Sequence, residues 1–226
     1  MRLDIAPGYV AIVAGGDIDP GVLPLLMGAS SVFAVDSGAQ FLSDHRLVPS
    51  VIVGDFDSCD TGVVERFRER GSRVLALQRD KEKTDTEVAL DLACEEGFSQ
   101  AVVLGALGGT RPEHSIANLF LLETFAARGL DVVLFHKETL VFALGGHEFP
   151  AYHCRSFRGR TGDWVSIFPV TREARGVTTS GLRFPLSRAI LTRGSTLGAS
   201  NEMTEEEACV SVEGGFLLVV VTGGSC

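Results

Sequence analysis

Two aspartates follow a short apolar run in the first third of the chain, in the segment Val53-Gly54-Asp55-Phe56-Asp57-Ser58. If the run is a buried strand, both aspartates lie at its carboxyl end, where open α/β sheets bind their ligands. In an extended chain residues i and i+2 point the same way, so the Asp55 and Asp57 carboxylates can face one point. Converging carboxylates are typical ligands of Mg²⁺. A polar turn in which Asp57 or Ser58 caps the next helix explains the same residues without a metal.

A second polar segment, Lys81-Glu82-Lys83-Thr84-Asp85, precedes a predicted helix. Thr84 with Glu87 matches the capping box that opens many helices. The first turn of a helix attracts anions through its free N–H groups and its dipole. Lys83 beside such a turn indicates a phosphate site, whereas Asp85 can reach the metal. A solvated charge run with a good N-cap is the simpler alternative.

A glycine-rich segment, Gly105 to Arg111, follows another apolar run. Glycines at a strand-to-helix turn let a ligand approach the backbone closely. Arg111 can clamp a phosphate or a carboxylate. His114 and Asn118 are four residues apart and share one face of the predicted helix that follows. A tight turn capped by Glu113 accounts for the same residues without a ligand.

The elements that must position these residues alternate along the first part of the chain. The apolar runs are continuous, as expected for parallel strands covered on both faces, and helical stretches lie between them. Predicted strands are Tyr9–Ala14, Ser31–Val35, Val51–Val53, Val74–Leu77, Ala101–Leu104 and Val132–Phe135, and the two clearest helices are Asp85–Glu96 and His114–Arg128. This order predicts an α/β domain with a doubly wound, mostly parallel sheet over residues 1–145.

After Gly145 the helical periodicity is lost, and short apolar runs alternate with turn residues. The predicted strands here are 164–168, 176–179, 208–212 and 216–221. Such spacing is typical of antiparallel sheets. We therefore expect a second, antiparallel β domain over residues 146–226.

Composition limits the class of protein further. The chain has 226 residues, is 45% hydrophobic and 22% charged, and is therefore expected to be globular rather than disordered. A net charge of −9 argues against nucleic acid as a partner. Its apolar runs are far shorter than the ~20 residues of a membrane helix, and no secretory signal is seen, so we expect a cytoplasmic protein that does not bind membranes. Five singly spaced cysteines favour reduced thiols over a disulfide framework or a zinc site.

Taken together, the motifs resemble those of the thiamine pyrophosphokinase (thiamine diphosphokinase) family. Gly54 to Ser58, then Lys83 to Glu87, then a Gly-Gly…Arg-x-Glu-His-x-x-x-Asn stretch follow one another in the family's order. Two later segments, Ser180 to Leu186 and Gly198 to Glu202, are similar to the family's thiamine-binding region. The likeness covers nearly the whole chain.

The resemblance implies a homodimer with shared active sites, built from an α/β catalytic domain and a β-sandwich thiamine-binding domain. The family transfers a pyrophosphoryl group from ATP to the hydroxyl of thiamine and releases thiamine diphosphate and AMP. Mg²⁺ is the implied cofactor, and ATP and thiamine are the implied substrates.

Roles for individual residues follow from the same resemblance. The implied catalytic and metal-binding residues are Asp55, Asp57 and Asp85. Contacts to the ATP phosphates are implied for Asp36, Lys83, Thr84 and Arg111. Contacts to thiamine are implied for Glu113, His114, Phe184, Ser200 and Asn201. Phe184 would offer a stacking surface from the partner subunit, and its alternative role is that of a core residue of the β domain.

Three positions depart from the family pattern. Thr110 is inserted before Arg111, Glu113 stands where the family has Asp, and Ser37 interrupts the usual Asp-Gly-Gly-Ala. Glu113 keeps the charge but reaches one methylene further. The Glu113 segment motivates one alternative, a pyrophosphokinase acting on another hydroxymethyl heterocycle such as a pterin. A second alternative, of a different class, is a non-catalytic thiamine sensor. The aspartate set favours an enzyme, because a sensor needs no metal–phosphate cluster.

Overall fold

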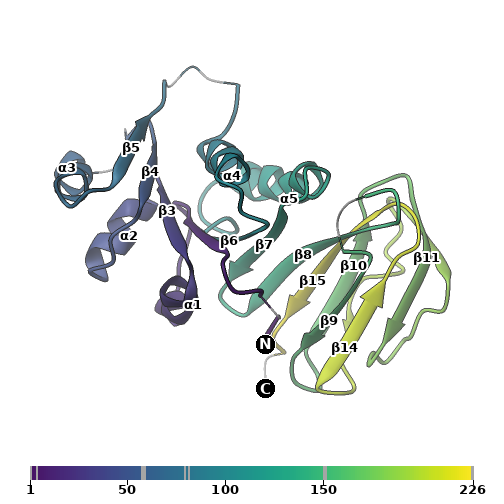
Figure 1. Ribbon diagram of the computed structural model, residues 1–226. Helices are drawn as coiled ribbons and strands as arrows, with labels where there is room; N and C mark the ends of the chain where they lie inside the picture. The colour runs from purple at the N-terminus through teal and green to yellow at the C-terminus, as the bar shows by residue number, and fades with distance from the viewer. Residues whose placement is uncertain are drawn as a thin grey trace. The chain divides into compact units, whose positions relative to one another are not determined.

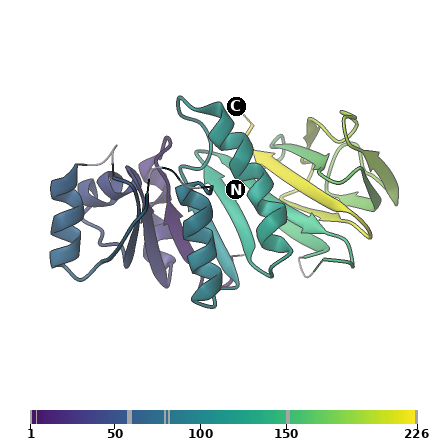
Figure 2. The ribbon, with the colours of Figure 1, turned by 90° about the horizontal axis from the view of Figure 1, so that it is seen from above.

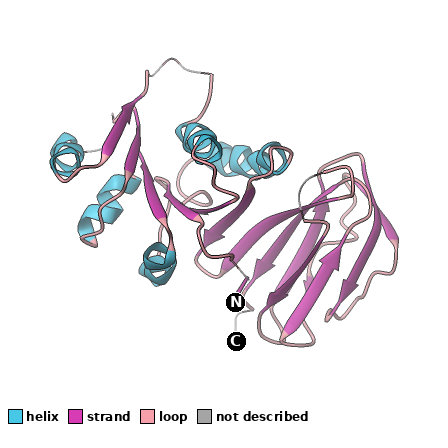
Figure 3. Cartoon of the chain, viewed as in Figure 1, coloured by secondary structure: helices cyan, strands magenta, loops and turns pink. Residues whose placement is uncertain are grey.

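The computed structural model describes residues 2–3, 5–56, 60–78, 80, 82–149 and 152–224. The chain divides into two compact units. The α/β unit comprises Ala6–Leu121 and Leu134–Lys137, and the β unit comprises Met1–Ile5, Leu122–Val133 and Glu138–Cys226. Helices alternate with strands in the α/β unit, whereas strands make up most of the β unit (Figure 3).

A parallel sheet forms the centre of the α/β unit (Figure 1). Its strands are β2 (Val10–Val13), β3 (Ser31–Val35), β4 (Val51–Gly54), β5 (Arg73–Ala76) and β6 (Gln100–Leu104), in the order β6-β2-β3-β4-β5. Every residue of β2, β4 and β6 is buried. The structure thus confirms the parallel strands predicted at β2 to β6. The continuous apolar runs of β2, β4 and β6 reflect cover on both faces, whereas β5 is mostly exposed, so the predicted cover is wrong there.

Helices cover the two faces of this sheet. They are the 3-10 helix η1 (Pro20–Val22), α1 (Leu23–Gly28), α2 (Gly38–Asp44), α3 (Thr61–Glu69), α4 (Asp85–Glu95) and α5 (Pro112–Ala126). Helices α1 to α3 lie on one face and α4 on the other (Figure 1), and the view from above shows the same separation (Figure 2). Strands β3 to β5 follow β2 on one side, and the next strand, β6, lies on the other side of β2. Because parallel strands are joined by right-handed crossovers, the helices before β5 and the helix after it must cover opposite faces of the sheet.

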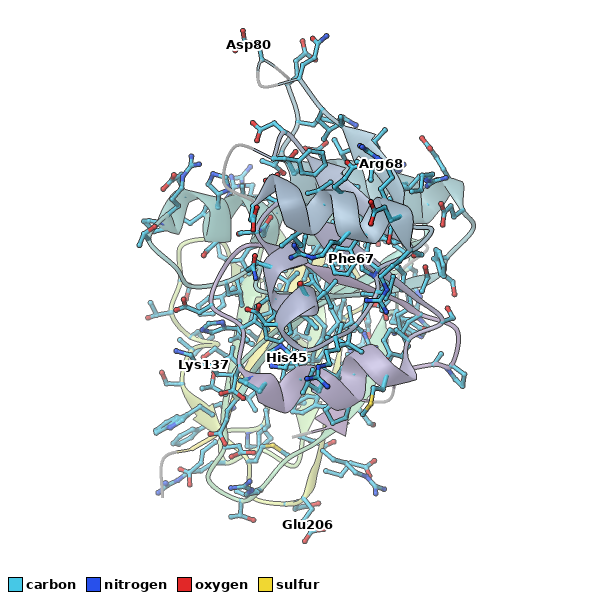
Figure 4. All side chains as sticks on the ribbon, turned by 90° about the vertical axis from the view of Figure 1, so that its left-hand side faces the viewer. His45, Phe67, Arg68, Asp80, Lys137 and Glu206 are labelled. Carbon is cyan, nitrogen blue, oxygen red and sulfur yellow. The ribbon has the colours of Figure 1, made fainter. Side chains whose placement is uncertain are left out.

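Burial follows the amphipathic pattern of each helix. In α3, Phe67 is buried toward the sheet, whereas the adjacent Arg68 is on the outer side and pairs with Glu65 (Figure 4). A helix with one apolar stripe stabilises the sheet by covering it and leaves its charged face in water.

The two helices predicted from sequence are present. The α4 helix is capped as predicted, because Thr84 Oγ1 accepts a hydrogen bond of 3.2 Å from the Glu87 amide. The α5 helix begins at Pro112, two residues before the predicted start, and ends at Ala126 rather than at Arg128. Proline is well suited to the first helical position, since its missing N–H has no partner there in any case.

The antiparallel strands of the β unit form two sets. One has the order β13-β10-β15-β8 and contains β8 (Thr139–Gly145), β10 (Trp164–Pro169), β13 (Asn201–Glu202) and β15 (Phe216–Thr222). The other has the order β1-β9-β14-β11-β12 and contains β1 (Arg2–Leu3), β9 (Cys154–Arg158), β11 (Glu173–Ser180), β12 (Ala189–Thr192) and β14 (Glu207–Ser211). The Phe142 and Phe157 rings, one from each sheet, pack at 5.8 Å. The predicted antiparallel β-sandwich is therefore confirmed.

Some features of this region were not predicted from sequence. The strand β8 pairs along its whole length with β15, although only β7 (Asp131–His136) was expected just before it. Cys154 and Cys209, far apart in sequence, lie on the neighbouring strands β9 and β14 with their Sγ atoms 3.3 Å apart. Both remain thiols. Among the described residues no helix is long and apolar enough to cross a membrane.

Candidate active site

A cavity of about 230 Å³ opens at the carboxyl ends of the parallel strands. It is lined by the segments that follow β2, β3 and β6 and by the starts of α4 and α5, namely Ala14–Gly16, Val35–Ser37, Thr84–Thr86, Gly105, Ala106, Gly108–Arg111, His114 and Asn118. Strands β3 to β5 follow on one side of β2, whereas β6 lies on its other side. The cavity thus lies where the strand order reverses, which is the usual ligand position in an open α/β sheet.

Glycine backbone forms one wall of this cavity. The Gly16 amide donates to Gly105 O at 3.0 Å, and the Ala14 amide donates to Leu104 O at 2.8 Å. Gly105 has φ +70, and a Cβ there would lie 2.7 Å from Ala14 O. No other residue fits this position without moving backbone, so a ligand meets main chain here rather than side chains.

Asp36 enters the cavity from the end of β3. Its φ is +46, and its amide donates to Val53 O at 3.0 Å. Its carboxylate lies over Gly54, where a Cβ would collide with Oδ1 and lie 3.0 Å from Cγ. Gly54 is therefore the residue that leaves room for this carboxylate. In the sequence, Gly54 stood out only as part of a motif. Its place directly before the aspartate pair was the signal that could have identified it as a site residue.

Asp55 follows β4 directly, but the extended conformation predicted for the aspartate pair is wrong. Phe56 has φ +60, so the backbone turns into the left-handed region after Asp55. The alternation that puts residues i and i+2 on one side holds only along an extended chain. Asp57 lies outside the described residues, and Asp55 is not among the residues that line the cavity.

The start of α4 supplies two of the predicted residues to the cavity, Thr84 and Asp85. Lys83 points elsewhere: its Nζ lies 2.6 Å from Asp91 Oδ2 and 3.6 Å from Glu87 Oε1. The hydrogen bond with Asp91 raises the pKa of the exposed Lys83 amine. This lysine is therefore fully protonated at neutral pH and held along the side of α4.

The start of α5 and the residue just before it bring four further predicted residues near the glycine loop. Arg111 and His114 line the cavity, and Arg111 Nε pairs with Glu113 Oε1 at 2.8 Å. That hydrogen bond lowers the pKa of Glu113, which is 61% exposed in its side chain and points toward Arg111. The buried Asn118 donates from Nδ2 to Ala106 O at 2.8 Å. As predicted, His114 and Asn118 share one helix face, and Asn118 uses it to hold the glycine loop.

Carboxylates suitable for a divalent cation are present in this unit. Asp36 and Asp85 both line the cavity, and oxygen ligands of this kind match Mg²⁺. Within the described ranges no group of three or more His, Cys, Asp or Glu side chains is arranged to hold a metal ion. The predicted set of Asp55, Asp57 and Asp85 includes one residue outside those ranges.

The remaining predicted residues lie in the β unit, around β13. Asn201 is buried and its side chain bonds the backbone of Phe184, at 3.0 Å from Phe184 N to Oδ1 and at 2.7 Å from Nδ2 to Phe184 O. Ser200 has φ +57, and its amide donates to Ser166 Oγ at 3.0 Å. Phe184 is 65% exposed, so the alternative that it belongs to the core is wrong.

Comparisons with known proteins match both units. Residues 23–134 match the family model described as thiamin pyrophosphokinase, catalytic domain, and residues 153–217 match thiamin pyrophosphokinase, vitamin B1 binding domain. A thiamine pyrophosphokinase of Bacillus subtilis (strain 168) is 27% identical over 215 residues, which cover 93% of this chain and 97% of that protein.

Two solved structures are similar over nearly the whole chain. The crystal structure of thiamine pyrophosphokinase from Bacillus subtilis has a TM-score of 0.83 at 24% identity and covers 95% of this chain and 99% of that one. The crystal structure of thiamin pyrophosphokinase from Geobacillus thermodenitrificans has a TM-score of 0.77 at 27% identity and covers 96% and 98%.

Proposed function

This chain belongs to the thiamine pyrophosphokinase family, and on that premise we propose that it transfers a pyrophosphoryl group from ATP to the hydroxyl of thiamine, giving thiamine diphosphate and AMP. The observation that carries the proposal is the succession of a catalytic match and a vitamin B1 binding match in one chain. The two alternatives, a pterin-like acceptor and a non-catalytic sensor, have no support in these matches.

We assign the ATP phosphates to the cavity of the α/β unit. Its glycine backbone lets phosphate oxygens approach main-chain N–H groups, and the start of α4 adds a helix N-terminus beside Thr84. Arg111 lines the same cavity and supplies a fixed positive charge. Asp36 and Lys83 complete the proposed set, and Lys83 must exchange Asp91 for phosphate when ATP binds.

Mg²⁺ is part of this proposal, with Asp55, Asp57 and Asp85 as the residues that would hold it. The donor chemistry of Asp85 fits, because Asp85 and Asp36 both line the cavity where the phosphates are expected, whereas Asp55 is proposed from its place directly after β4. When bound, the cation neutralises phosphate charge. Asp55→Asn and Asp57→Asn are each expected to lower turnover by orders of magnitude at saturating Mg²⁺. Near-normal turnover in either variant, folded by circular dichroism, would remove that residue from the set.

Thiamine is assigned to Glu113 and His114 at the start of α5 and to Phe184, Ser200 and Asn201 in the β unit. An aromatic face suits a flat aminopyrimidine and a cationic thiazolium, and Phe184 offers an exposed ring. Phe184→Ala is expected to raise the thiamine KM by about 5- to 150-fold, by analogy with base–aromatic stacking. The melting temperature is expected to stay close to that of the parent, because little of this ring is buried.

We also propose that the catalytic domain spans 1–145 and the thiamine-binding domain 146–226, and that two chains form a homodimer with shared sites. The two family matches fall on either side of Gly145.

The proposed homodimer is supported by the exposed surface of the β unit. Large apolar side chains are exposed there, among them Trp164 (47%), Phe168 (39%) and Leu197 (66%). Exposed apolar surface of this kind favours association with another chain. The cytoplasm, which supplies ATP and Mg²⁺, is the proposed compartment.

Release of AMP from ATP, Mg²⁺ and thiamine tests the proposed reaction directly. AMP is expected in equal amount to thiamine diphosphate, since the pyrophosphoryl group moves intact. ADP in place of AMP, or turnover of hydroxymethylpterin but not of thiamine, would contradict it.

Shared sites are tested by mixing an Asp55→Asn chain with a Ser200→Ala/Asn201→Ala chain. The mixture is expected to recover activity. Activity no higher than that of either variant alone would indicate that each site is built within one chain.

A further inference from the structure

Asn201 is committed to the chain itself rather than open to a ligand. Its Oδ1 accepts from the Phe184 amide at 3.0 Å and from the Glu202 amide at 2.9 Å. Its Nδ2 donates to Phe184 O at 2.7 Å. The side chain is buried, so these bonds are shielded from water. The amide of Asn201 thus pairs with both backbone groups of Phe184.

Hydrogen-bond capacity limits what else Asn201 can do. A carboxamide oxygen accepts two hydrogen bonds and its NH₂ group donates two. Both acceptor positions of Asn201 and one of its donors are in use. A single N–H is left, so Asn201 is unable to accept a hydrogen bond from the amino group of an aminopyrimidine while these contacts persist.

The residue held in this way presents an aromatic ring to solvent. Phe184 is 65% exposed, yet its backbone is fixed on both sides by Asn201. The Arg183 guanidinium carbon lies 5.8 Å from the ring centroid, and Arg183 is itself held by Glu202 at 3.0 Å. An exposed ring that is already ordered loses less conformational freedom when a flat ligand stacks on it.

We propose that Asn201 is a positioning residue that acts on thiamine through Phe184, by clamping the Phe184 backbone so that its ring is presented in one orientation. The inference rests on the proposed function, since it needs Phe184 to contact thiamine. It assigns Asn201 a role different from the direct pyrimidine contact implied by family resemblance.

A double-mutant cycle separates these two roles. The variants are Asn201→Ala, Phe184→Ala and the double substitution, with Thr178→Val as the matched control. Thr178 Oγ1 accepts from the Arg188 amide at 3.1 Å, so this control removes a similar side-chain-to-backbone bond further along the same connection. The readouts are KM for thiamine, KM for ATP, kcat, and deuterium exchange at the Phe184 amide.

Asn201→Ala is expected to raise the thiamine KM at least about fivefold, within the range for a lost stacking contact, and to leave the ATP KM unchanged. In the Phe184→Ala background the same substitution is expected to change the thiamine KM by less than twofold, because a residue that acts through another has no effect once that residue is gone. The Phe184 amide should exchange faster in Asn201→Ala, and Thr178→Val should leave every readout at its parental value.

If the parent enzyme is active, any of three results would overturn the inference. The first is additive effects of the two substitutions on the thiamine KM, which would indicate direct contact by Asn201. The others are an unchanged thiamine KM in Asn201→Ala and unchanged deuterium exchange at the Phe184 amide in that variant. If Asn201→Ala does not fold, Asn201→Asp keeps the size and the acceptor but sets an oxygen against Phe184 O, and the same expectations apply. A parent chain that releases no AMP with thiamine refutes the proposed function, which is a distinct outcome.

Discussion

Gly54→Ala tests whether the space above Gly54 is what positions the Asp36 carboxylate. An alanine Cβ at residue 54 would collide with Asp36 Oδ1 and lie 3.0 Å from its Cγ and 3.3 Å from its amide nitrogen. Carbon atoms pack favourably at about 3.5–4.0 Å, so the Cγ must move by about 0.5–1 Å. The amide nitrogen is held by its bond to Val53 O, so the side chain has to give way.

The displacement is expected to lower activity as well as stability. A misplacement of about 1 Å in a substrate-positioning group can cost about 10²-fold in rate, which corresponds to about 2.7 kcal/mol in the barrier. Overpacking of a core position typically costs about 1–3 kcal/mol of unfolding free energy. For a domain of this size, that cost would lower the melting temperature by about 2–12 °C.

Steady-state AMP release and a thermal melt measure the two effects, with Gly62→Ala as the control. A Cβ at Gly62, in the first turn of α3, meets only the side-chain ends of Asp60 at 3.2 Å and Arg66 at 3.4 Å. The control should retain parental activity and be as stable as the parent or slightly more so. A folded Gly54→Ala chain with kcat/KM within threefold of the parent would refute the reasoning, as would a loss that is fully additive with Asp36→Asn.

Three further predictions concern other parts of the chain. Lys83→Ala should weaken ATP binding more than thiamine binding in calorimetric titrations and leave the unfolding free energy nearly unchanged, because the Lys83 side chain is exposed. Asn118→Ala should cost about 1–3 kcal/mol in denaturant unfolding and raise the ATP KM, because the buried Ala106 carbonyl loses its donor. The pKa of Cys154 is raised to about 11 by the loss of solvent around its thiol and by its hydrogen bond with Cys209. Alkylation of Cys154, measured by mass spectrometry, should therefore be slow at pH 8 and become faster up to about pH 11.

Much of the fold could be predicted from sequence because burial imposes a simple pattern. Strands such as β2 and β6 are buried at every residue, so their apolar runs are continuous and easily recognised. The start of α4 was predictable as well, since Thr84 caps it within four residues of sequence. The strand β8 was missed even though it is mostly buried. It follows β7 after the two-residue turn Lys137-Glu138, and the polar residues between the two apolar runs were the available signal.

The candidate site was less predictable, because it depends on backbone conformation and on pairing between distant residues. Phe56 adopts φ +60, which no alternation rule anticipates for a phenylalanine. Lys83 stands beside a helix start in sequence, yet its amine is held by Asp91, eight residues further on. The bond between Asn118 and Ala106 and the clamp of Asn201 on Phe184 join residues 12 and 17 positions apart. Spacing alone carries no information about such pairs.

These contacts suggest where the specificity of such a site resides. Pyrophosphoryl transfer between ATP and an alcohol is mostly a matter of positioning and charge stabilisation. The charged groups can be supplied by many surfaces, but their placement here depends on uncharged residues: Gly54 leaves room for Asp36, Asn118 holds the glycine loop at Ala106, and Asn201 holds Phe184. Substitutions at these uncharged positions should therefore change substrate KM values as strongly as many substitutions of charged residues, although their side chains need not touch a substrate.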